Sequence, residues 1–143
     1  MTAVHLTVWD ETRAGADAVL LVHGPMTWGT ACFEAQRPLA RHYRLLVMDR
    51  RGFGESPDID RSDYEVDAAD VVESLGDGAH LVGHSYGGVV AQAGNKRYLG
   101  ECFPPISCLR WRTANGLRAN KRGAGHEPHR ERPELVNTTL RDL

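Results

Sequence analysis

The stretch AHLVGHSYGG, residues 79–88, decides the fold and carries the most informative side chain of the sequence, Ser85. Its apolar first half predicts a buried strand, and the residues after it predict a sharp turn that opens a helix. Gly83, Gly87 and Gly88 leave room for the backbone to double back around Ser85. The sequence therefore predicts a serine hydroxyl held in the turn between a strand and a helix.

This context gives the GxSxG pattern a chemical interpretation. A serine in such a turn is the geometry of a nucleophile elbow. The unpaired backbone N–H groups at the start of the following helix can stabilise developing negative charge. We therefore predict two catalytic residues: Ser85 as the nucleophile, and Tyr86, whose backbone N–H is the first oxyanion donor.

Two upstream segments add to the pattern. Residues 18–24, AVLLVHG, form an apolar run that ends in a turn, and residues 45–48, LLVM, form another that is followed by DRRGFGES at residues 49–56. With these segments in this order, residues 4–94 resemble the α/β-hydrolase fold family of serine hydrolase type. The resemblance implies an α/β fold, here a partial α/β-hydrolase fold with a mostly parallel sheet and flanking helices. It also implies esterase-like hydrolysis of a small carboxylic ester or related acyl compound. No cofactor is predicted, because the sequence has no phosphate-binding or metal-ligand motif.

The elements expected from the residue pattern alternate as this fold requires. Strands are predicted at residues 5–9, 18–22, 45–48 and 79–82. Helices are predicted at residues 31–43, where Pro38 should end or kink the helix, and from a cap at Ser62 or Asp63 to about Leu75. Another helix follows Ser85.

The pattern stops near Asn95, and the charge balance changes there. Residues 1–94 hold seven basic and 14 acidic residues, whereas residues 95–143 hold ten basic and five acidic residues. Residues 116–133 are rich in Arg, Gly, His and Pro without periodicity. We therefore expect a partial α/β-hydrolase domain at residues 1–94 and an irregular, basic tail at 95–143 that is disordered or poorly packed, consistent with a truncation or frame shift after about residue 94.

This interruption affects the catalytic triad, because the family takes its acid and histidine from later strands. Glu101 followed by His126 or His129 preserves the order serine, acid, histidine, but these histidines are more simply interpreted as solvated residues of the tail. The resemblance assigns structural roles to His23, in the oxyanion loop, and to His84, next to Ser85.

The oxyanion loop itself departs from the family pattern. The residue after His23-Gly24 is Pro25, which has no backbone N–H to donate, so the N–H of Met26 would have to substitute. Trp28, just after this loop, is interpreted as a core residue in preference to a wall of the substrate pocket.

Other classes of function have little support. Cys32, Cys102 and Cys108 are too few for a disulfide framework and are interpreted as packing residues, and the spacing of Cys102, Cys108, His126 and His129 matches no familiar zinc pair. No metal or nucleotide site is predicted, nor a nucleic-acid or membrane partner. The absence of a leader or long apolar run favours a cytoplasmic location.

A non-catalytic alternative remains beside the enzyme hypothesis. If later strands are missing, the strand at residues 79–82 would present unpaired backbone groups at a sheet edge. Such a truncated remnant would act at most as a binding or interaction protein, and it could self-associate through that edge.

Overall fold

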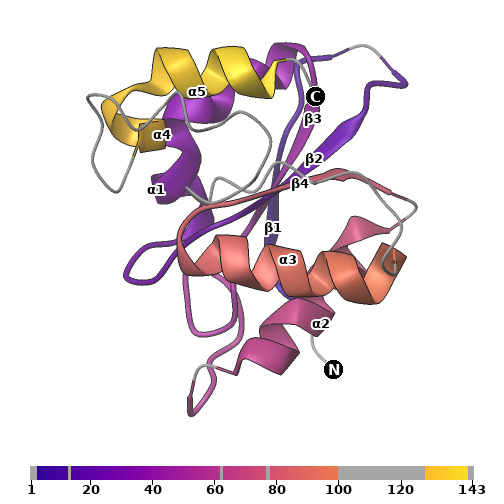
Figure 1. The fold of residues 1–143 in the computed structure, drawn as a ribbon, viewed down its shortest axis with the longest axis vertical. Helices are drawn as coiled ribbons and strands as arrows, with labels where there is room; N and C mark the ends of the chain where they lie inside the picture. Colours follow the sequence, from indigo (N-terminus) through magenta and orange to yellow (C-terminus); the bar gives the residue numbers. More distant parts are fainter. Residues whose placement is uncertain (1–2, 13, 62, 77, 100–127, 142–143) are drawn as a thin grey trace.

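A four-stranded sheet forms the centre of the protein, and its strands agree with the predicted ones to within one residue at each end. The computed structural model describes residues 3–12, 14–61, 63–76, 78–99 and 128–141. The strands are β1 (Leu6–Trp9), β2 (Ala18–Val22), β3 (Arg44–Met48) and β4 (His80–Gly83), in the order β1-β3-β2-β4 (Figure 1). Strand β2 runs parallel to both β3 and β4, and β1 pairs antiparallel with β3. The fold is therefore a mostly parallel α/β arrangement.

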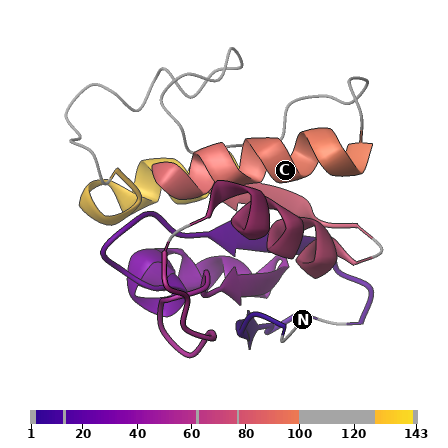
Figure 2. The same cartoon turned by 90° about the horizontal axis from the view of Figure 1, so that it is seen from below.

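Helices cover both faces of the sheet, as the continuous apolar character of β2 and β4 requires. On one face lie α2 (Tyr64–Leu75) and α3 (Tyr86–Leu99), which run next to each other in Figures 1 and 2. Their core cluster consists of Leu20, Val22, Met48, Val71, Leu75, Leu81, Val90 and Ala91. Alternate side chains of β2 thus enter alternate cores, because successive residues of a strand point to opposite faces.

The other face is covered by α1 (Gly29–Phe33), the 3-10 helix η1 (Glu34–Arg41), α4 (Pro128–Glu131) and α5 (Pro133–Leu140). The buried residues there are Trp9, Val19, Leu21, Cys32, Phe33, Leu39, Ala40, Leu45, Val47, Val82, Val136 and Leu140. The helix predicted at residues 31–43 is therefore present but divided, and Pro38 lies within its 3-10 part.

The caps of α2 show how local sequence sets the ends of a helix. The Asp63 side chain accepts hydrogen bonds from the backbone N–H groups of Glu65 and Val66, and Gly76 ends the helix at φ 54°. A positive φ is strained for residues with a Cβ, which is why glycine is suited to this position. Of the two predicted caps, Asp63 is the one used.

Part of the predicted tail packs against the domain, which differs from the expectation for residues 95–143. Helix α4 contacts α1 and η1, and α5 contacts η1, although about 100 residues separate these segments in the sequence; α4 and α5 are drawn in yellow in Figure 1. Val136 and Leu140 are fully buried there. The spacing of these two residues puts them on one helical face, and burying that face outweighs the polar composition of the preceding segment. Residues 100–127 lie outside the described residues.

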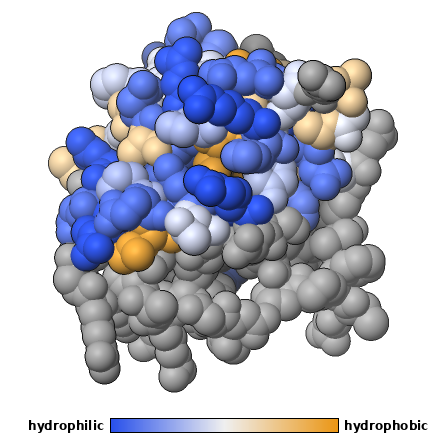
Figure 3. All heavy atoms as spheres, turned by 90° about the horizontal axis from the view of Figure 1, so that it is seen from above, coloured by the Kyte–Doolittle hydropathy of each residue, from blue (hydrophilic) through white to orange (hydrophobic). Residues whose placement is uncertain are grey.

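The surface seen from the side of α5 is mainly hydrophilic, with small separate apolar areas (Figure 3). Among the described residues, no helix has both the length and the apolar character needed to cross a membrane. The exposed large apolar side chains of the described part are Val8, Met26, Trp28 and Tyr64.

Candidate active site

Ser85 lies in the turn between β4 and α3, at the carboxyl end of the strand. Its φ is 55°, in the left-handed region that residues with a side chain rarely adopt. Strand β4 ends at Gly83 and α3 begins at Tyr86, so the reversal is completed within two residues. Backbone strain of this kind is concentrated at functional sites, because the surrounding structure must hold it in place.

Glycines allow this turn to pack against the loop after β2. A Cβ on Gly83 would collide with the backbone of Gly87, and one on Gly87 would collide with the carbonyls at the end of β2 and the start of that loop. A Cβ on Gly24 would lie 3.2 Å from the Cβ of Ser85. The Gly24 backbone is therefore in close proximity to Ser85.

The segment at residues 49–56 is a tightly bonded turn. The Asp49 carboxylate accepts hydrogen bonds from the backbone N–H groups of Gly29 (2.7 Å) and Glu55 (3.0 Å), and the Ser56 hydroxyl donates to the Asp49 carbonyl (2.5 Å). Asp49 thus fixes the start of α1 to the end of β3. The turn supports the site without contributing a reacting group.

Arg50 connects this turn to the loop after β2. Its guanidinium donates to the carbonyls of His23 (3.1 Å) and Gly24 (3.2 Å) and pairs with the carboxylate of Asp67 in α2 (2.9 Å). The side chains of Arg50 and Asp67 are 2% and 1% exposed, so this ion pair is fully buried. Burial raises the pKa of Asp67, and the nearby Arg50 charge opposes that shift. The arrangement holds the carbonyls of the loop in a fixed orientation.

His23 is held in its neutral form. Its Nε2 accepts a hydrogen bond from the Arg50 backbone N–H (3.0 Å), so the proton is on Nδ1, which donates to the Gly24 carbonyl (2.6 Å). Burial lowers the pKa of His23 to about 4, although the hydrogen bond to Gly24 favours the charged form. Both ring nitrogens are engaged in positioning the loop, which matches the structural role that the resemblance implied.

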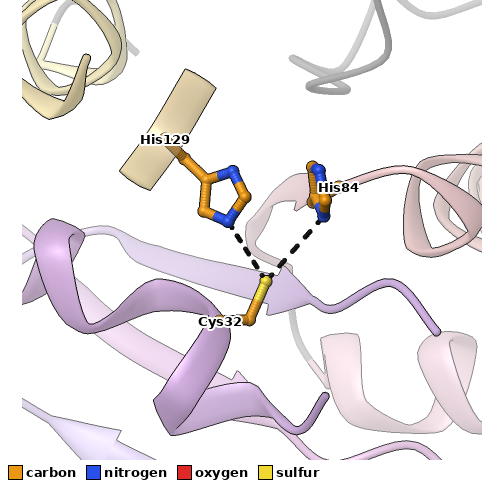
Figure 4. Close-up of side chains that lie close together, drawn as sticks. All are labelled: Cys32, His84 and His129. Atoms are coloured by element: carbon orange, nitrogen blue, oxygen red, sulfur yellow. Dashed lines mark hydrogen bonds between the residues drawn. The ribbon is translucent and has the colours of Figure 1, made fainter. Parts of the chain in front are cut away.

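The structure places His129 differently from the sequence interpretation. His129 of α4 is fully buried instead of solvated, and its Nε2 lies 3.4 Å from the Sγ of Cys32. His84 Nδ1 lies 3.9 Å from the same sulfur, and the two imidazole rings are 4.2 Å apart (Figure 4). Spacing along the sequence does not reveal this Cys32–His84–His129 cluster, because His84 is 52 residues and His129 is 97 residues from Cys32. Glu101, Cys102, Cys108 and His126 lie outside the described residues.

The loop after Gly24 is exposed. Met26 is 96% exposed and has a φ of 61°. Trp28 is 50% exposed, so the interpretation of Trp28 as a core residue was wrong. Its place at the N-cap of α1, directly after the exposed loop, leaves half of its side chain in solvent.

A surface hollow of about 240 Å³ lies at the opposite edge of the sheet, lined by Asp17, Ala18, Gly78, Ala79 and His80. These residues are at the amino ends of β2 and β4. Parallel α/β sheets bind their ligands at the carboxyl ends of the strands, where Ser85 lies. We therefore do not assign the candidate active site to this hollow.

Comparisons with known proteins agree with the geometry. The family model described as "Alpha/beta hydrolase family" matches residues 19–110. A pimeloyl-[acyl-carrier protein] methyl ester esterase of Aeromonas salmonicida is 42% identical over 79 residues, which are 54% of this chain and 31% of that protein.

Two solved esterase structures are similar as well. A thermophilic esterase from Thermogutta terrifontis superposes with a TM-score of 0.55 at 37% identity, covering 66% of this chain and 36% of that one. A marine microorganism esterase has a TM-score of 0.60 at 21% identity, covering 74% and 39%, a likeness of fold. The chain thus spans between three tenths and four tenths of the length of these relatives.

Proposed function

Because the chain belongs to the alpha/beta hydrolase family, we propose that it is a serine hydrolase with esterase-like activity on a small carboxylic ester or related acyl compound. The esterases among its relatives support the reaction class. Ser85 is the proposed nucleophile, and the turn that holds it is the proposed nucleophile elbow.

One observation carries this proposal: Ser85 has a φ of 55° in a two-residue turn between β4 and α3. The tight contacts made at Gly24, Gly83 and Gly87 show why the turn tolerates no bulk around that serine. A structural serine has no need of such a strained position, whereas a nucleophile gains exposure at the carboxyl edge of the sheet.

The proposed chemistry follows from the groups around the turn. The Ser85 hydroxyl attacks the carbonyl carbon of the ester while a histidine base takes its proton, and the alcohol leaves with that proton. Water then cleaves the acyl-enzyme and releases the acid. The Tyr86 backbone N–H, at the N-terminus of α3, is the proposed first donor to the oxyanion.

The second oxyanion donor is proposed to be the Met26 backbone N–H, because Pro25 has none. Met26 follows the Gly24 backbone that contacts Ser85, and its φ of 61° marks a second sharp bend there. Loss of one oxyanion donor costs about 2.7–4 kcal/mol of transition-state stabilisation, or about 10²–10³-fold in rate. The reaction would be slower by this factor if the Met26 N–H did not replace the missing donor.

No histidine is assigned as the base of the reaction. Glu101 and His126 lie outside the described residues, and His129 is fully buried with its Nε2 3.4 Å from the Sγ of Cys32. The proposal therefore rests on the nucleophile and its turn, not on a complete triad.

Labelling with a fluorophosphonate, combined with hydrolysis of p-nitrophenyl acetate, tests the proposal. We expect Ser85→Ala to abolish both signals, because no other group of the proposed site attacks the ester. Ser74→Ala, in α2, is the matched serine control and should behave as the wild type. Labelling that persists without Ser85, or a folded wild type that takes no label, would refute the proposal.

A non-catalytic, self-associating remnant is the second candidate, and the sheet topology favours it specifically. Among the described strands, β4 pairs only with β2, so its other edge has no strand partner there. Such an edge can pair with a second chain. Light scattering during size-exclusion chromatography should then show a dimer or larger species, and a monomer at all concentrations would exclude this mode.

A further inference from the structure

The Cys32–His84–His129 cluster brings three soft ligand atoms together from distant parts of the chain. Cys32 comes from α1, His84 follows β4, and His129 belongs to α4, and their side chains point toward one another (Figure 4). The sulfur and one nitrogen of each ring all lie within 4.8 Å of one another. Serine hydrolysis as proposed above uses none of these three groups.

The distances within the cluster approach those of a zinc site. Zinc binds sulfur at about 2.3 Å and imidazole nitrogen at about 2.0–2.1 Å in tetrahedral sites, which puts a sulfur and a nitrogen ligand about 3.5 Å apart. The observed separations from Cys32 Sγ are 3.4 Å to His129 Nε2 and 3.9 Å to His84 Nδ1. The ligand nitrogens of the two rings lie within 4.8 Å of each other, and zinc would require about 3.3 Å between them.

The surroundings suit a soft cation. Cys32, His84 and His129 are 2%, 5% and 0% exposed, so the ligands are screened from water. A thiolate and neutral imidazoles select zinc over hard cations such as Mg²⁺ or Ca²⁺, which prefer oxygen ligands. Three protein ligands leave one tetrahedral position for water or another small exchangeable ligand.

We propose that Cys32, His84 and His129 form a zinc-binding site that joins α1, the residue before Ser85, and α4. On binding, the Cys32 thiol releases its proton to solvent and both imidazoles bind in their neutral form. The bound ion links segments up to 97 residues apart and thereby anchors the C-terminal helices to the domain. This site is independent of the serine chemistry, so either proposal can fail alone.

The first test uses the full chain, stripped of metal with a chelator and titrated with Co²⁺ and then Zn²⁺. We expect one equivalent of Co²⁺ to give a thiolate-to-cobalt charge-transfer band and the visible bands of tetrahedral cobalt, both removed by Zn²⁺. Cys32→Ser should abolish the charge-transfer band, and His129→Gln should weaken zinc binding by at least about 100-fold. The exposed His42 provides the matched control, and His42→Gln should retain wild-type binding.

A second measurement leaves the three cluster residues unchanged and therefore does not depend on how the cluster variants fold. X-ray absorption of the zinc-loaded wild type should show one sulfur and two imidazole ligands. The double variant Cys102→Ser, Cys108→Ser should leave that spectrum unchanged. Absence of stoichiometric binding, a ligand shell with no sulfur or with two, or a spectrum that depends on Cys102 or Cys108 would overturn the proposal.

Discussion

Acidification should destabilise the fold through His23, because this histidine is buried in its neutral form. Its pKa is lowered from 6.5 to about 4, so the unfolded chain binds the proton first as the pH falls. The contribution of neutral His23 is intact above pH 6.5 and is lost between pH 6.5 and 4. At about 1.36 kcal/mol per pH unit, the free energy of unfolding should fall by about 2 kcal/mol between pH 7 and pH 5, and by about 3 kcal/mol in the acid limit.

Urea unfolding followed by circular dichroism at pH 7, 6 and 5 measures this loss. His23→Gln lowers stability at pH 7, because the Arg50 N–H and the Gly24 carbonyl lose their partner, but it also removes the titrating group. Its pH slope should therefore be shallower than that of the wild type by the stated amount. His42→Gln, which removes an exposed histidine, should keep the wild-type slope. If His23→Gln retained the full wild-type slope, the assignment of the acid sensitivity to His23 would be wrong.

Two further substitutions test the packing of the domain. Leu140→Ala should lower the free energy of unfolding by about 2–5 kcal/mol, because the Leu140 side chain is 1% exposed in the core. Thr138→Ala, on the exposed side of α5, is the control and should change that free energy by less than about 0.5 kcal/mol. Equal effects of the two substitutions would mean that α5 is not docked. Asp67→Asn should lower the free energy of unfolding by about 3–5 kcal/mol, because it leaves the buried Arg50 charge without its partner. Glu134→Gln breaks an exposed ion pair and should lower it far less. Calorimetric unfolding of both variants measures the difference, and equal losses would contradict the prediction.

The strands and the position of Ser85 could be predicted from the sequence because each depends on a short continuous segment. A short apolar run that ends in turn residues, such as residues 18–22, is typical of a buried parallel strand, and the glycines near Ser85 indicate a local steric need for small residues. The structure confirms the strand positions and the Asp63 cap.

Other features depend on contacts that composition conceals. The 116–133 segment has the composition of a solvated chain, yet α4, which overlaps its end, buries His129 completely. The cluster with Cys32 and His84 exists only through tertiary folding, so ligand spacing along the chain gives no sign of it. Trp28 was misplaced because hydrophobicity alone does not show that its neighbour in the chain is an exposed loop.

Helix α5 belongs to the core of the domain, although its stretch of sequence was expected to lie in a poorly packed tail. Val136 and Leu140 enter the same core cluster as Phe33 and Leu39, and the Asn137 side chain donates to the Ala35 carbonyl (2.9 Å). Burial of the two apolar side chains stabilises the docked helix, and the hydrogen bond satisfies the amide at its edge. The helix is therefore held by the same core that holds the strands.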